Sequence, residues 1–142
     1  MIALTEDKRM LGYGVMTPYS NIFCFATTRR GGFSKGDYAS FNCTPYTGDD
    51  AESVRRNQEL LCNSMPQHPK ELVIPFQTHG TKVEVIDEKY LNATSDERTA
   101  MLQGVDALIT KEPGCCICIS TADCIPILLY DCKNQVVAAA HA

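Results

Sequence analysis

A chain of 142 residues that is 44% hydrophobic and 21% charged has the balance of a folded globular protein, which excludes a disordered chain and leaves little room for two domains. The formal net charge is −4 and no run of lysine or arginine is longer than a pair, so nucleic acid and anionic membranes are excluded as main partners. The first ten residues carry both charge signs without an apolar core, and no segment reaches transmembrane length. We therefore expect a cytoplasmic protein whose eight cysteines stay mostly reduced.

The first part of the chain predicts a strand, an ordered loop and a helix. β-Branched and aromatic residues predict a strand over residues 22–28. The glycines and hydroxyl groups of residues 29–42 are typical of an ordered loop. Asp49 or Asp50 can cap a helix that runs to about Cys62, because apolar side chains recur on one face at helical spacing.

The second part is dominated by strands. Apolar, β-branched runs predict strands over residues 72–77, 82–86, 105–110, 115–121, 125–131 and 135–140. Residues 91–103 are polar, and we expect a loop there with some helix. Lys133 and Asn134 are suited to a hairpin turn between the last two strands. These last strands are apolar on both faces, so we expect their sheet to be covered on both sides, within a mixed α/β fold.

Three residues that can bind a metal stand where predicted strands begin or end. His79 follows one strand, Cys124 directly precedes the strand 125–131, and His141 ends the strand 135–140. A hairpin would bring Cys124 and His141 to the same edge of the sheet. Two imidazoles and a thiolate suit zinc or copper, and three ligands leave a fourth position for water. Spacing alone leaves two alternatives open: purely structural roles, and a nucleophile–base pair of Cys124 with His141.

Other polar residues have weaker patterns. The loop around Arg29 offers a guanidinium, hydroxyls and backbone amides, which can hold a phosphate or a carboxylate, although an ordinary surface turn explains it equally well. Asp123 can act in proton transfer beside Cys124. Asp106 lies within an apolar strand, and we interpret it as a structural hydrogen-bond acceptor.

Three cysteines lie close together in the sequence but do not indicate a metal site. Neighbouring residues of a strand point to opposite faces, and the surrounding residues are apolar. Free cysteine behaves as a small hydrophobic residue, so we expect packing roles for Cys115, Cys116 and Cys118.

Several motifs together resemble a known family. In chain order they are Thr28-Arg29-x-Gly31-Gly32-x-Ser34-x-Gly36-x-Tyr38-x-Ser40-x-Asn42, Gly48-Asp49-Asp50 with Val54 and Asn57, Gln77-x-His79-Gly80, Asp106-Ala107-Leu108, Thr121-Ala122-Asp123-Cys124-x-Pro126 and His141-Ala142. They cover roughly residues 22–142, and this order over that span is hard to obtain by chance. The pattern resembles the proteins first called polyphenol oxidases, or laccases, which are now associated with purine nucleoside phosphorolysis and adenosine deamination.

The resemblance implies a fold, a site and a function. The fold would be an α/β (α+β) layered αββα sandwich like the catalytic domain of cytotoxic-necrotising-factor toxins. The metal ligands would be His79, Cys124 and His141, with zinc as the metal and copper as the alternative. The resemblance also implies that Arg29 belongs to the same pocket. We expect Arg29 and Asp123 to be the catalytic residues, and Arg29, Ser40 and Asn42 to bind substrate. The partners would be purine nucleosides, including methylthioadenosine, with phosphate as co-substrate.

The sequence also departs from the family. The family usually has leucine at Phe41, Leu-Gly at positions 43–44 and arginine at Gln58, and its members are about twice as long. We therefore expect residues 1–142 to be the N-terminal part of a single metal-dependent domain, and the fragment itself to be inactive. Two alternatives remain: a copper-dependent polyphenol oxidase, and a non-catalytic fragment that only binds a partner.

Overall fold

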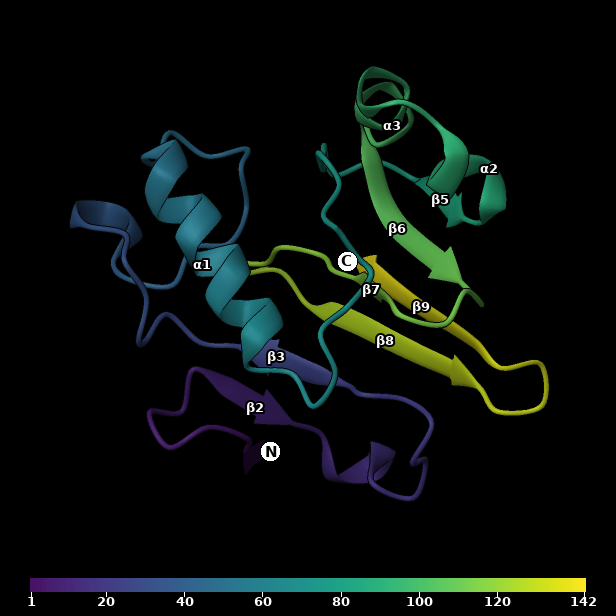
Figure 1. Cartoon of the computed structure of the whole chain (residues 1–142), viewed down its shortest axis with the longest axis horizontal. Coiled ribbons are helices and arrows are strands. Elements are labelled where there is room, and N and C mark those ends of the chain that lie inside the picture. Colours follow the sequence, from purple (N-terminus) through teal and green to yellow (C-terminus); the bar gives the residue numbers. More distant parts are fainter. The chain divides into compact units, whose positions relative to one another are not determined.

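The computed structural model describes residues 1–142, which form two compact units over residues 1–68 and 69–142 (Figure 1). Both units contain β-sheet and α-helix, so the mixed α/β class is confirmed. The αββα layering and the likeness to the toxin domain stay predictions. None of the helices is long and apolar enough to cross a lipid bilayer.

The first unit contains a small antiparallel sheet and one long helix. The strands are β1 (Ile2–Ala3), β2 (Met10–Gly12) and β3 (Phe25–Thr27), with 3-10 turns at η1 (Gly14–Met16) and η2 (Gly36–Tyr38). The sheet order is β1-β2-β3. The predicted strand over 22–28 is shorter in the structure because its partner β2 offers only three residues for pairing. Pattern reasoning did not predict β2, although Met10 is fully buried.

Helix α1 (Ala51–Asn63) agrees with the predicted helix. Asp50 is the N-cap residue, and its carboxylate accepts a hydrogen bond from the Ser53 backbone amide at 2.8 Å. Val54 and Leu61 are buried on one face, as the apolar spacing predicted. The polar Asn57 is buried between them and has no exposed surface.

The second unit contains two sheets and two short helices. Its elements are β4 (Glu71–Val73), β5 (Lys82–Ile86), α2 (Glu88–Asn92), α3 (Ser95–Met101), β6 (Val105–Thr110), β7 (Cys115–Ile117), β8 (Pro126–Asp131) and β9 (Val136–His141). Strands β4 and β7 pair in parallel, and the larger sheet has the order β5-β6-β9-β8. The bounds of β5 and β6 match the prediction, whereas β4 and β7 are shorter.

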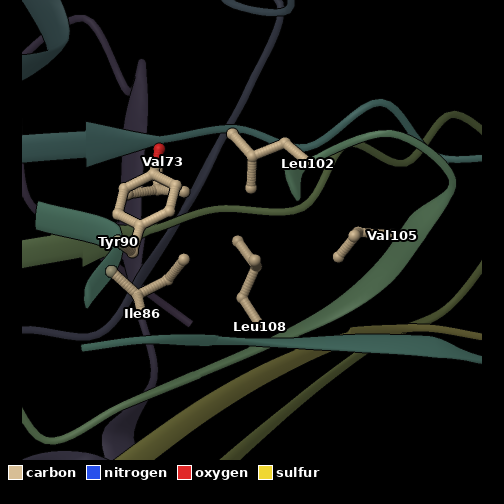
Figure 2. Close-up of a cluster of buried hydrophobic side chains, with 6 residues drawn as sticks. All are labelled: Val73, Ile86, Tyr90, Leu102, Val105 and Leu108. Carbon is tan, nitrogen blue, oxygen red and sulfur yellow. The ribbon is translucent and has the colours of Figure 1, made fainter. Parts of the chain in front are cut away.

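The region predicted as a loop with some helix is largely helical. Asp87 caps α2 through the Tyr90 amide, and Thr94 and Glu97 form a reciprocal capping box at the start of α3. Tyr90 of α2 and Leu102, which follows α3, pack with Ile86 and Leu108 of the larger sheet (Figure 2). This cluster forms the core of the unit, and it covers one face of the sheet.

The opposite face of the same sheet is apolar, and it is exposed along the edge strands and half-buried along the inner strands. Cross-strand register places Val83 of β5 in one row with Ile127 of β8, and Val85 in the next row with Leu129. Alanine and isoleucine side chains of β6 and β9 complete both rows. The exposed fractions of the four edge-strand residues lie between 43% and 60%. The expectation of a sheet covered on both sides is therefore met on one face only, because no element of this unit packs on the other.

The last two strands form the predicted hairpin. Strands β8 and β9 are antiparallel and are joined by a tight turn after Asp131 (Figure 1). Pro126 pairs with His141, so the start of β8 lies beside the end of β9. Ile125 and Ala142 exchange two further backbone hydrogen bonds of 2.8 and 3.0 Å beyond the end of the strands.

Candidate metal centre

His79, Cys124 and His141 converge on one site, and the hairpin geometry predicted this for Cys124 and His141. One ligand atom from each residue lies within 4.8 Å of the other two. The Cys124 Sγ atom is 3.9 Å from His79 Nε2, and the His79 and His141 rings meet edge-on with centroids 4.8 Å apart. The spread is somewhat wider than the roughly 4 Å expected for a zinc set.

The His79 loop takes an unusual backbone conformation. His79 has a φ angle of 59°, in the left-handed region that few residues other than glycine adopt. The Asp106 side chain holds this turn, because Oδ1 accepts from the His79 amide at 3.0 Å. Its Oδ2 accepts from the amides of Thr78 at 3.2 Å and Gly80 at 2.8 Å. The expected role of Asp106 as a hydrogen-bond acceptor is thus found, with three amides of one turn as donors.

The same carboxylate also contacts the third candidate ligand. His141 Nδ1 lies 3.1 Å from Asp106 Oδ1, and the two side chains are only 6% and 4% exposed. Burial acts to raise the pKa of Asp106, but the amide donors and the His141 ring outweigh burial and hold the pKa below its ordinary value. The carboxylate is therefore ionised at neutral pH.

Gln77 ties the His79 loop to the segment that leads to Cys124. The Gln77 side chain donates to the Ser120 carbonyl at 2.9 Å and accepts from the Ser120 amide at 2.6 Å. A side-chain amide that pairs with both backbone groups of one residue fixes the relative position of the two segments. The two loops that bring His79 and Cys124 together are thus fastened to each other four residues before the cysteine.

The chemistry of the donor atoms and the distance between Cys124 and His79 fit a tetrahedral metal ion. For metal–nitrogen bonds of about 2.0–2.1 Å and a metal–sulfur bond of about 2.3 Å, neighbouring nitrogen and sulfur ligands lie about 3.6 Å apart. The 3.9 Å between Cys124 Sγ and His79 Nε2 is close to that value. Imidazole and thiolate ligands are those preferred by zinc and by copper.

The alternative of a thiol activated by one histidine fits this geometry less well. The imidazole contact at Cys124 involves His79 rather than His141, which that alternative requires. The His141 Nδ1 atom faces Asp106 instead. Two imidazoles around one thiolate are what a metal site needs, whereas an activated nucleophile needs one.

Asp123 is exposed and lies beside the site. Its Oδ1 atom is 3.9 Å from Cys124 Sγ. The carboxylate therefore lies next to one candidate ligand. Its catalytic role stays a prediction.

Arg29, Ser40 and Asn42 lie in the first unit, in the predicted ordered loop. Arg29 is exposed, and its Nε donates to the Ala39 carbonyl at 2.8 Å. Ser40 Oγ donates to the Arg29 carbonyl, while Asn42 Nδ2 donates to Asp49 at 3.0 Å and to a threonine hydroxyl. Ser40 and Asn42 therefore shape the loop, and the substrate-binding role of all three residues stays a prediction.

Asn57, which the sequence patterns did not single out, anchors this loop. Asn57 Oδ1 accepts from the Phe33 amide at 2.8 Å, and Nδ2 donates to Ser34 Oγ and to the carbonyls of Ser40 and Asn42. A polar residue on the apolar face of a predicted helix was the available signal, since buried amides need partners.

Two of the departures from the family pattern contact each other. Gln58 Nε2 donates to the Cys43 carbonyl at 2.8 Å. The bond goes to the backbone of residue 43, so it depends on the side chain at position 58 and not on the side chain at position 43.

The three neighbouring cysteines are not among the candidate ligands. Cys115 packs against the core cluster, as predicted. The Sγ atoms of Cys116 and Cys118, two residues apart on β7 and just beyond it, are 3.6 Å from each other. All three are free thiols of intermediate exposure.

Residues 23–142 match the family described as multi-copper polyphenol oxidoreductase laccase, so the chain belongs to that family. It is 63% identical over all 142 residues to a purine nucleoside phosphorylase of Bacteroides thetaiotaomicron, covering 53% of that protein. It is 41% identical over 118 residues, or 83% of the chain, to the adenosine deaminase RL5 of an unknown prokaryotic organism, covering 45% of it.

The fold also has relatives among solved structures. YlmD from Geobacillus stearothermophilus superposes with a TM-score of 0.77 at 30% identity, over 88% of this chain and 46% of YlmD. YfiH from Bacillus licheniformis gives 0.72 at 26% identity, over 82% of this chain and 43% of YfiH. The chain thus spans about half the length of the relatives that it matches.

Proposed function

We propose that this chain contributes the metal centre of a zinc-dependent purine nucleoside phosphorylase that also acts on adenosine by deamination and on methylthioadenosine. The observation that carries the proposal is the convergence of His79, Cys124 and His141 within 4.8 Å. The names of two relatives, a purine nucleoside phosphorylase and an adenosine deaminase, support the reaction class. The free thiols support a reducing, cytoplasmic location.

Zinc bound by these three residues would supply Lewis acidity, which polarises an oxygen of water or of phosphate. Asp123 is exposed beside Cys124 and is our candidate for moving a proton at its Oδ1 atom. Arg29 is exposed, with Nε engaged at Ala39, and its remaining guanidinium N–H groups can bind a phosphate oxygen pair. In this proposal Ser40 and Asn42 hold the loop that presents Arg29 to phosphate and the ribose.

The family description favours one alternative, a copper-dependent polyphenol oxidase. The same ligands suit copper, so the donor set by itself does not separate the metals. A polyphenol oxidase must carry out four-electron oxygen chemistry. One site with three ligands is weak support for such chemistry, so we rank this alternative second. The metal content of the purified protein and its phosphate requirement distinguish the two.

The test uses a chimera in which this chain replaces the matched span of the B. thetaiotaomicron phosphorylase. Zinc and copper content are measured, and adenosine, inosine, guanosine and methylthioadenosine are assayed with and without phosphate. We expect zinc, and release of the base together with a sugar phosphate only when phosphate is present. Deamination of adenosine is followed separately as formation of inosine.

Matched cysteine variants test the site within the same chimera. Cys124→Ser should lower both zinc content and turnover by at least about a hundredfold, because loss of a ligand exceeds the 10–100-fold effect of losing a residue that supports one. Cys132→Ser is the control, since Cys132 is an exposed free thiol in the hairpin turn. Turnover that survives Cys124→Ser, or oxidation of phenols with copper bound, would overturn the proposal.

A further inference from the structure

The Asp106 side chain contacts both histidines of the candidate metal centre. Its Oδ1 atom accepts from the His79 backbone amide at 3.0 Å and lies 3.1 Å from His141 Nδ1. It is 3% exposed, and it extends from β6, one of the two inner strands of the larger sheet. We propose that Asp106 is a positioning residue that sets the ring orientation and the tautomer of His141 and the backbone conformation of His79. The inference rests on the proposed metal site.

The His79 turn needs an anion at its centre. Three successive amides, of Thr78, His79 and Gly80, point at one carboxylate. Successive amides that converge in this way form a concave, electropositive nest. Because His79 is in the left-handed region, the free turn would relax to other conformations, and the imidazole would move away from Cys124. The carboxylate keeps the turn in the conformation that presents the ring.

The contact at His141 selects one tautomer. An ionised carboxylate can only accept hydrogen bonds, so the His141 nitrogen that faces it, Nδ1, must carry the hydrogen. The lone pair of the neutral ring is then on Nε2, which is left to bind a metal. A carboxylate behind a histidine ligand also fixes the plane of the ring.

A second aspartate in the same sheet offers a matched control. Asp131 also accepts two backbone amides of a turn, those of Lys133 and Asn134, at 2.9 and 3.1 Å. It is exposed at the hairpin turn, at the end of β8 remote from Pro126 and His141. Replacing Asp131 by asparagine therefore tests what the loss of a turn-stabilising carboxylate does when no histidine is involved.

The first measurement needs no substitution. The tautomer of His141 is determined from the ring 15N shifts of the metal-free chain by NMR spectroscopy at neutral pH. We expect the Nδ1–H form, whereas neutral histidine exposed to water populates mainly the Nε2–H form. An Nε2–H tautomer at His141 would overturn the proposal, because Asp106 would then not control the ring.

The second measurement compares Asp106→Asn with Asp131→Asn. Asparagine keeps the size of the side chain, but its NH₂ group cannot accept from the turn amides. We expect cobalt(II), used as a spectroscopic probe for zinc, to bind Asp106→Asn on the order of 10–100-fold more weakly, with a weakened thiolate charge-transfer band. Asp131→Asn should bind as the unaltered chain does. Equal cobalt affinity and spectra in all three proteins would overturn the role of Asp106.

The two readouts separate this inference from the proposed function, because neither involves a nucleoside. If the unaltered chain shows the Nδ1–H tautomer but binds no cobalt, the metal site fails and with it the proposed function. If the chain binds cobalt but phosphorolysis is never found, Asp106 keeps its role and only the reaction fails. If Asp106→Asn does not fold, the tautomer in the unaltered chain decides.

Discussion

The buried Asn57 side chain should be worth several kilocalories per mole to the first unit. In Asn57→Ala, the Phe33 amide loses its hydrogen-bond partner and so does the Asn42 carbonyl. The Ser40 carbonyl keeps a partner, because it also accepts from the Ser34 amide at 2.9 Å. Two backbone groups are therefore left unsatisfied, each costing about 1–3 kcal/mol when buried. Since the loop can admit some water, we expect a total loss of about 2–4 kcal/mol.

The assay pairs urea denaturation with hydrogen exchange. The free energy of unfolding is measured by circular dichroism, and exchange of the Phe33 amide reports on the loop itself. Gln58→Ala is the control, since this neighbouring side chain makes a single hydrogen bond to the Cys43 carbonyl. The Gln58→Ala substitution should lower the free energy of unfolding by about 1 kcal/mol or less. If both variants cost the same, or if the Phe33 amide stays equally protected, the assignment of Asn57 as the anchor of the loop is wrong.

Three further predictions concern thiols and packing. Burial raises the pKa of Cys43 from its ordinary 9.0 to about 12, so at pH 8 it should hold roughly a thousandfold less thiolate and be alkylated correspondingly more slowly; mass spectrometry measures this against exposed Cys132. Leu108→Ala should cost about 2–5 kcal/mol in urea denaturation because the side chain is fully buried, whereas Leu129→Ala, 60% exposed, should cost little. Cys118→Ala should lower stability with cobalt binding unchanged, and loss of the metal would contradict a packing role.

The sequence patterns predicted the structure correctly where a single local rule determines it. Strands β5 and β6 have the predicted bounds because β-branched residues are flanked by polar or glycine residues. The convergence of Cys124 and His141 followed from antiparallel pairing alone, since a hairpin places the start of one strand beside the end of the next.

Other features depend on contacts between distant residues. Strand β2 has three residues and exists because β3 pairs with it, so no local run announces it. Asp106 could be recognised in the sequence as a buried carboxylate in need of donors, but its partners lie 26 to 35 residues away. The start of α3 was different, because Thr94 followed by Glu97 is a readable capping-box signal that the polar composition obscured.

The exposed apolar face of the β5-β6-β9-β8 sheet has a thermodynamic consequence for the isolated chain. Burial of such a surface is driven by entropy near room temperature and lowers the heat capacity. Any self-association through the face that carries Val85 and Leu129 should therefore strengthen on warming and weaken in the cold. Sulfate should promote this self-association. The substitution Val85→Lys should oppose it, because a charged side chain on the apolar face resists desolvation. Cold, low-sulfate buffers are thus the conditions in which the metal affinity of a single chain can be measured.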